Sequence, residues 1–198
     1  MERVLVLERP VVLRRSIAAL LGAALVAAAA QVSVPLPGTP VPMTLQPLAV
    51  LLVGGLLGAR LGAASLMVYL ALGAAGLPVF TPTVPLLGIA RLLGPTGGYL
   101  LAYPIAAFAV GRLADGGRKP GSPEAPARTH TWTRIAAGVF AGLALIHLGG
   151  LAQLFIITGD VSAALRFGTL PFLLGDLGKL LVAIVVLKSS IRPLRARL

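Results

Sequence analysis

Long uncharged runs of Leu, Ala, Val and Gly dominate this chain, and short segments rich in Pro, Gly and Arg separate them. Runs of this length and continuity are typical of helices that cross a bilayer, whereas strands of a membrane barrel alternate between apolar and polar residues. The pattern predicts six helices, at residues 16–34, 43–57, 61–77, 97–113, 135–157 and 171–187. We therefore expect an all-α, polytopic membrane protein, a six-transmembrane-helix bundle in which residues 1–198 form one transmembrane domain.

Two of these helices have a second interpretation. The helix at 43–57 is short enough to be re-entrant, which would leave five crossings. The basic start of the chain, the apolar run after it and the small residues at 28–30 also fit a cleaved signal peptide. We favour a retained first helix, because the apolar run is long enough to span.

The segments between the helices are rich in helix breakers. Prolines at positions 35, 37, 40 and 42 predict an extended connection after the first helix, and residues 78–91 contain three more prolines and predict a loop. Residues 114–134 are polar and rich in Gly, Pro and Arg, which is typical of a linker.

Composition agrees with the membrane class. The chain is 57% hydrophobic with a mean hydropathy of +0.95, and it contains no cysteine, which excludes disulfides and thiolate metal sites. Its two histidines, His130 and His147, have no carboxylate or second histidine at metal-ligand spacing, so both are interpreted as structural or surface residues. We expect no metal site and no cofactor.

The net charge of +11 indicates topology rather than binding of nucleic acid. With six crossings, 14 of the 17 Lys and Arg residues fall on the side of the two termini, and only Arg91 and Arg166 fall on the other side. By the positive-inside rule both termini and the linker at 114–134 are then cytoplasmic, in a multi-pass protein of the cell (inner) membrane.

Asp176 and Lys179 are two charged residues inside an otherwise apolar helix. A charge in hydrocarbon costs roughly 2.5–3.5 kcal/mol, so such residues normally face a partner or a wet cavity. Three-residue spacing places both on one helix face, near its outer end. They form either an internal salt bridge that holds helices together or part of a site for a polar ligand.

Small residues repeat at helical spacing in two places. Gly54, Gly58 and Gly62 predict close helix packing. In the first helix, Ala19, Ala23 and Ala27 share one face, while Ala24 and Ala28 lie on the adjacent face. Either face could pack inside the bundle or contact another membrane protein.

Four segments, taken in order, resemble the BioY family, the biotin-binding S components of energy-coupling factor (ECF) transporters. They are residues 41–46 (VPMTLQ), 73–80 (GAAGLPVF), 94–100 (GPTGGYL) and 171–179 (PFLLGDLGK). The resemblance covers about residues 16–187 and implies a protein that captures biotin from outside. It also implies docking on a transmembrane coupling protein and two ABC-type ATPases, whose ATP hydrolysis drives release inward.

The resemblance also implies which residues bind biotin. Asp176 would accept a hydrogen bond from a ureido N–H, and Lys179 would donate to the ureido oxygen or balance Asp176. Thr44, Gln46 and Tyr99 are further candidates, although each could be a packing or capping residue. Arg91 is a candidate for a different reason: it is the only cation in the loop before the helix at 97–113, so it could attract the valerate carboxylate unless it is a solvated loop residue.

The same resemblance implies that the alanine face of the first helix, with Ala19, Ala23 and Ala27 as candidates, docks on the coupling protein. From its placement alone, we expect the proline-containing loop at 78–91 to close over the ligand as a lid. An S component for another vitamin would share the bundle and differ only in its pocket.

Enzyme classes find little support. The chain has no Gly-x-Ser-x-Gly elbow and no P-loop, since Gly178-Lys179 lacks the preceding glycine at position 173. A small intramembrane protease would need two cooperating acids, and Asp160 and Asp176 are expected in different segments. A binding subunit that borrows ATP hydrolysis from partners fits better.

Overall fold

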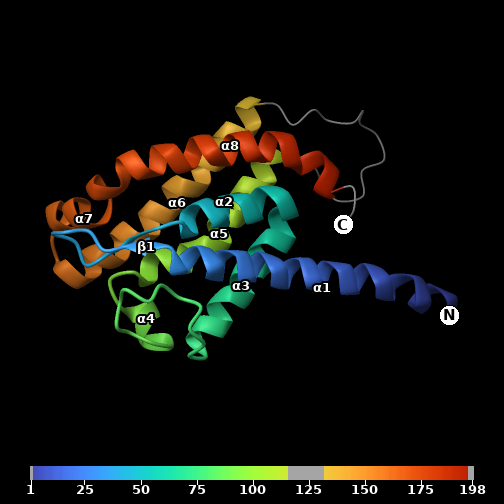
Figure 1. Cartoon of the computed structure of the whole chain (residues 1–198), viewed down its shortest axis with the longest axis horizontal. Helices are drawn as coiled ribbons and strands as arrows, with labels where there is room; N and C mark the ends of the chain where they lie inside the picture. The colour runs from blue at the N-terminus through green and yellow to red at the C-terminus, as the bar shows by residue number, and fades with distance from the viewer. Residues whose placement is uncertain (1, 116–131, 196–198) are drawn as a thin grey trace.

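The structure is a computed structural model that describes residues 2–115 and 132–195. Most of the predicted linker at 114–134, including His130, lies outside the described residues. The described part is almost entirely helical, as predicted (Figure 1). Its long helices are α1 (Glu2–Gln31), α5 (Gly97–Ala114), α6 (Trp132–Thr158) and α8 (Leu173–Arg195). Shorter ones are α2 (Gln46–Leu57), α3 (Ala59–Ala74), α4 (Ile89–Leu93), α7 (Val161–Gly168) and the 3₁₀ turn η1 (Leu170–Phe172).

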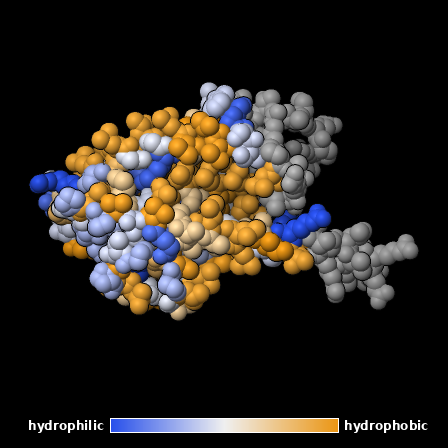
Figure 2. Space-filling model, viewed as in Figure 1, coloured by the Kyte–Doolittle hydropathy of each residue, from blue (hydrophilic) through white to orange (hydrophobic). Residues whose placement is uncertain are grey.

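Four segments of the described chain are long and apolar enough to cross a membrane, and the protein is a multi-pass membrane protein. They lie at 12–31, 97–114, 132–158 and 161–191, while α2 and α3 are apolar but shorter. Figure 2 shows an apolar surface over the middle of the molecule, with hydrophilic residues gathered mainly at the end that holds α7 and the loop around α4.

A short hairpin replaces the start of the second predicted helix. β1 (Ser33–Val34) pairs antiparallel with β2 (Met43–Thr44), so that α2 begins at Gln46 rather than at Met43. The prolines between the two strands exclude helix, as expected, and Pro47 stands in the first turn of α2, where a missing N–H costs nothing. The hairpin thereby carries Thr44 to the entrance of α2.

α5 is the central helix and packs against α2, α3 and α6. The predicted close packing at Gly54, Gly58 and Gly62 is confirmed. A Cβ on Gly62 would lie 2.9 Å from the Cα of Gly54, and a Cβ on Gly54 would overlap the backbone of Ala107 in α5. Gly58 has φ +85°, which favours glycine and lets the chain turn directly from α2 into α3. Backbones this close leave no room for a side chain.

The two predicted loops of the outer side contain helices of their own. Residues 78–91 run into α4, and the segment after α6 forms α7, whose first turn is capped by Asp160 accepting from Ser162 N at 2.8 Å. Both lie at the end of the bundle opposite to the start of α1 and the end of α8 (Figure 1). The loop that leads to α4 and the β1–β2 hairpin both contribute residues to the wall of a cavity.

Candidate functional site

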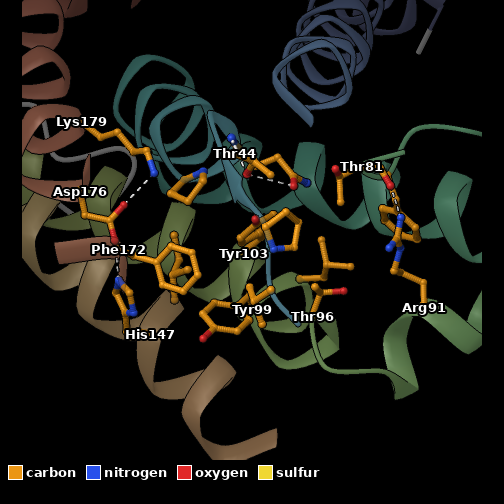
Figure 3. A pocket seen from close by; sticks show the side chains of 17 residues that line it. Thr44, Thr81, Arg91, Thr96, Tyr99, Tyr103, His147, Phe172, Asp176 and Lys179 are labelled. Carbon is orange, nitrogen blue, oxygen red and sulfur yellow. Dashed lines mark hydrogen bonds and ion pairs between the residues drawn. The ribbon is translucent and has the colours of Figure 1, made fainter. Parts of the chain in front are cut away.

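The cavity lies between the first turns of α2, α5 and α8, the middle of α6, and the loop that leads to α4. Its empty volume is about 560 Å³, including the open space at its mouth. All six residues predicted to bind a ligand line it, although they come from five separate segments of the chain: Thr44, Gln46, Arg91, Tyr99, Asp176 and Lys179. Figure 3 shows two charged groups on opposite sides of the cavity, with aromatic side chains between them.

The first charged group is built around Asp176, and it includes the predicted pair. Lys179 Nζ donates to Asp176 Oδ1 at 2.8 Å, and both residues are buried. The one-face geometry expected from their spacing is confirmed. Because both side chains also line the cavity, the pair is not sealed inside the protein.

His147 completes this group. The interpretation of His147 as a structural or surface residue, drawn from the lack of a carboxylate at metal-ligand spacing, did not anticipate this contact. His147 Nε2 lies 2.8 Å from Asp176 Oδ2, and its Nδ1 lies 3.4 Å from Thr169 Oγ1. The contact joins α6 to α8 across 29 positions, so spacing along the chain could not reveal it. The sequence carries another indication of this contact: a lone ionisable residue inside an apolar span is expected to have a polar partner.

The second charged group is Arg91, which is only 1% exposed. The alternative of a solvated loop arginine is therefore wrong. One of its terminal nitrogens donates to Thr81 O, while Nε and the other terminal nitrogen have no hydrogen-bond partner among the described residues. Burial lowers the pKa of the Arg91 guanidinium from its usual value. Arginine side chains stay protonated in proteins, so the group is a cation.

Buried donors without partners are costly, and they are rare in folded proteins. Thr96, which also lines the cavity, has a buried hydroxyl without a described partner as well. Arg91 and Thr96 come from neighbouring segments on the same side of the cavity (Figure 3). Together they offer unsatisfied hydrogen-bonding groups to an anion.

Tyr99 contributes its ring to the cavity wall, while its hydroxyl is used elsewhere. The hydroxyl donates to Gly168 O at 2.5 Å and thus ties α5 to the end of α7. The ring fills the space beside Gly150 in α6, where any Cβ would overlap it. Tyr103, one turn further along α5, also lines the cavity and was not predicted.

Thr44 and Gln46 belong to one hydrogen-bonded chain. Thr44 Oγ1 donates to Gln46 Oε1 at 3.2 Å, and Gln46 Nε2 donates to the Tyr69 hydroxyl at 2.6 Å. Tyr69, in α3, is fully buried and packs edge-on against Phe80. The arrangement fixes the Gln46 amide, and one of its N–H groups remains available to the cavity.

The loop at 78–91 forms a wall of the cavity. Phe80 and Thr81 line it, and Phe80 packs on Gly73 of α3. Among residues 2–115 and 132–195, no three His, Cys, Asp or Glu side chains come close enough together to hold a metal ion.

The predicted docking face of the first helix is largely buried. Ala19 and Ala23 are 9% and 3% exposed, and Ala27 packs partly against the core. Ser65 of α3 donates to Ala19 O at 2.6 Å, which shows how closely the two helices approach. Ala19 and Ala23 therefore serve internal packing, while Ala24 and Ala28 are exposed on the outer face of α1.

Comparison with known proteins gives a consistent result. The model of the BioY family matches residues 3–196. The biotin transporter BioY of Thermotoga maritima is 37% identical over 174 residues, which are 88% of this chain and 94% of that protein. The probable biotin transporter BioY of Pyrococcus horikoshii is 38% identical over 163 residues, 82% of this chain and 87% of that protein.

A solved structure is similar as well. It is the S component for biotin from an ECF-type ABC transporter, with a TM-score of 0.75 and 26% sequence identity. The similarity covers 93% of this chain and 91% of that one.

Proposed function

This chain belongs to the BioY family, and from that premise we propose that it is the biotin-binding S component of an ECF transporter, with biotin held in the cavity described above. The relatives are named transporters, and the protein is a transport subunit rather than an enzyme. The observation that carries the binding site is the separation of two charged groups across one cavity (Figure 3).

Biotin has the same division of chemistry. Its fused ring carries a ureido group with one acceptor oxygen and two N–H donors, and its valerate chain ends in a carboxylate. The middle of the molecule is apolar and suits a wall built from Tyr99, Tyr103 and Phe172. A cavity with a donor–acceptor pair at one end and, at the other, a cation with two donors that have no partner among the described residues fits this molecule in one orientation.

The ureido group lies at the Asp176 end in this proposal. Each oxygen of the Asp176 carboxylate already accepts one hydrogen bond from the protein, and each can accept a second. Asp176 therefore accepts from a ureido N–H, while Lys179 donates to the ureido oxygen. Thr44 and Gln46 complete the polar part of this wall.

The carboxylate lies at the Arg91 end. A carboxylate supplies acceptors to the two guanidinium nitrogens that have no described partner, and it neutralises a buried positive charge. Thr96 lines the same cavity with a buried hydroxyl that has no described partner, and it is a second donor for the same anion. Burial of Arg91, rather than its position in the sequence, supports this assignment.

We further propose six crossings, with the cavity open to the outside and both termini in the cytoplasm. The four long spans are joined by α2 and α3, which have 12 and 16 residues and would complete six crossings. The start of α1, the turn between α2 and α3, the end of α5, the start of α6 and the end of α8 lie at the end of the bundle away from α7 and α4 (Figure 1). These segments carry Arg60, Arg112, Arg134 and Lys188, and Arg14 and Arg15 stand at the start of the apolar span of α1, so the positive-inside rule supports a cytoplasmic location for this end.

The partner is an ECF module, made of a transmembrane coupling protein and two ATPases. Its docking surface on this chain is the outer face of α1, where Ala24 and Ala28 leave small, exposed positions beside the exposed side chains of Leu21 and Leu25. Small residues at a spacing of four allow a second helix to approach closely in a membrane.

Equilibrium binding to the purified protein tests the function. One biotin should bind per chain, and saturating biotin should raise the melting temperature by about the amount expected from RT ln(1 + [L]/Kd). Riboflavin and thiamine are the controls. A shift with either of them and none with biotin would assign the cavity to a different vitamin.

A further inference from the structure

We propose that His147 is a positioning residue for biotin: its contact with Asp176 holds the carboxylate in the orientation that accepts the ligand, and protonation of His147 weakens binding. The inference rests on the proposed function, because it concerns the same cavity. His147 would contribute to binding by orienting Asp176, without a hydrogen bond of its own to biotin. Biotin affinity would then also depend on pH.

The geometry around Asp176 carries the first half of the proposal. Lys179, one turn away on α8, reaches Oδ1, and His147 reaches Oδ2 from α6, both at 2.8 Å. Lys179 alone would leave the carboxylate free to turn, because this torsion has broad minima. With one donor on each oxygen the plane of the carboxylate is fixed, and the remaining lone pairs keep a constant direction.

The surroundings of His147 allow it to be neutral or protonated without rearrangement. An ionised carboxylate only accepts, so Nε2 carries a hydrogen in either state. In the neutral ring Nδ1 accepts from the hydroxyl of Thr169, 3.4 Å away, and in the protonated ring Nδ1–H donates to the same oxygen. A hydroxyl can do both, so Thr169 suits both forms.

The charges that face His147 determine what its proton does. Asp176 and Lys179 face it from α8 and carry opposite charges. Tyr99 faces it from α5, edge-on at 6.2 Å between ring centroids, with its hydroxyl bound to Gly168. Arg91 lies on the opposite side of the cavity (Figure 3). A proton on His147 therefore gives an otherwise neutral group a positive charge.

That extra charge weakens the site for a ureido N–H. Asp176 would then be held by two cations, and its remaining lone pairs would be poorer acceptors for the ligand. Affinity should therefore be lower with His147 protonated than with it neutral. The valerate does not contribute above about pH 5.5, because carboxylic acids titrate near 4.3.

Two variants separate positioning from packing. His147→Gln keeps an N–H donor but cannot titrate, and His147→Phe keeps a ring but cannot donate. Biotin affinity is measured by calorimetry at about pH 8 and pH 5.5 for both variants and for the wild type. Binding by the wild type should weaken by about threefold or more at the lower pH. The Gln variant should bind within about threefold of the wild type at the higher pH, without the pH dependence, while the Phe variant should lose about tenfold or more.

The outcomes distinguish this inference from the proposed function. If the wild type binds biotin but shows the same pH profile as the Gln variant, the role of His147 is overturned. It is equally overturned if a folded Phe variant keeps wild-type affinity. Should the Phe variant not fold, the pH profile of the Gln variant decides. Failure of the wild type to bind biotin at about pH 8 would instead overturn the proposed function itself.

Discussion

The charged side chains of the cavity are buried, so water does not compete for their hydrogen bonds. Asp176, Lys179 and Arg91 are each less than 10% exposed, yet all three line the cavity. In such surroundings a hydrogen bond to a charged group is worth more than at the surface, and a charge without a partner is costly. Substitutions here should therefore affect binding and stability in separable ways.

The ion pair in α8 gives the first prediction. Asp176→Asn and Lys179→Met should each weaken biotin binding by about tenfold or more, since a charged hydrogen bond is worth roughly 1.5–3 kcal/mol. Each should also lower the melting temperature, because the remaining ion loses its partner.

The double variant Asp176→Asn/Lys179→Met is the matched control. It removes both charges and should recover stability without recovering binding. If both single variants bind biotin within about threefold of the wild type, these residues do not hold the ligand.

Arg91 gives a second prediction, at the other side of the cavity. Arg91→Gln should weaken binding of biotin by about tenfold or more, because the carboxylate loses its cation. Biotin amide, which has no carboxylate, should bind weakly to the wild type and no more weakly to the variant. A competition assay with both ligands measures the difference, and equal losses for the two would contradict the assignment.

At the scale of the elements, helix contacts set the shape of the cavity. Gly150 in α6 gives the ring of Tyr99 its place, and the Tyr99 hydroxyl ties α5 to α7. Gly150→Ala should therefore displace the ring, destabilise the protein by about 1–3 kcal/mol and weaken biotin binding. Thermal unfolding in detergent and calorimetry check both effects.

Gly178→Ala is the control for that substitution. Gly178 lies in α8, and nothing stands within 4 Å of the position that its Cβ would take. The variant should fold and bind normally. If both substitutions destabilised the protein equally, the loss of stability at Gly150 would come from replacing a helical glycine and not from displacing the Tyr99 ring.

The first helix gives a prediction about the partner. Ala24→Leu/Ala28→Leu fills the exposed face of α1, so it should reduce co-purification with a co-expressed ECF module by about tenfold while leaving melting temperature and biotin affinity unchanged. Ala23→Leu, on the buried face, should instead lower the melting temperature. Normal assembly of the double variant would place the docking surface elsewhere.

At the scale of the whole molecule, the loop around α4 and the first turn of α8, which line the cavity, lie at the end of the bundle opposite to the start of α1 and the end of α8 (Figure 1). The chain has no cysteine, so single cysteines can report its orientation. In intact cells a membrane-impermeant thiol reagent should label Ser162→Cys, near the cavity, and should not label Arg134→Cys. Labelling of Arg134→Cys alone would reverse the proposed orientation.

The helical class, the membrane setting and six of the residues that line the cavity could be predicted from the amino-acid sequence. Apolar runs predict helices because the bilayer demands satisfied backbone groups over a known thickness, and charged residues inside such runs stand out for the same energetic reason. Resemblance of the motifs indicated Thr44, Gln46 and Tyr99, whereas Arg91 was indicated by its place as the only cation of its loop.

Tertiary structure alone decided which contacts these residues make. The partnership of His147 with Asp176 joins two helices, the burial of Arg91 depends on a loop folded against α3 and α5, and the alanine repeat of α1 fits either of two faces. Sequence periodicity describes one helix at a time, so it can place residues on a face but cannot say what that face meets. The direction of each face is set by packing against the other helices, and only the assembled bundle contains that information.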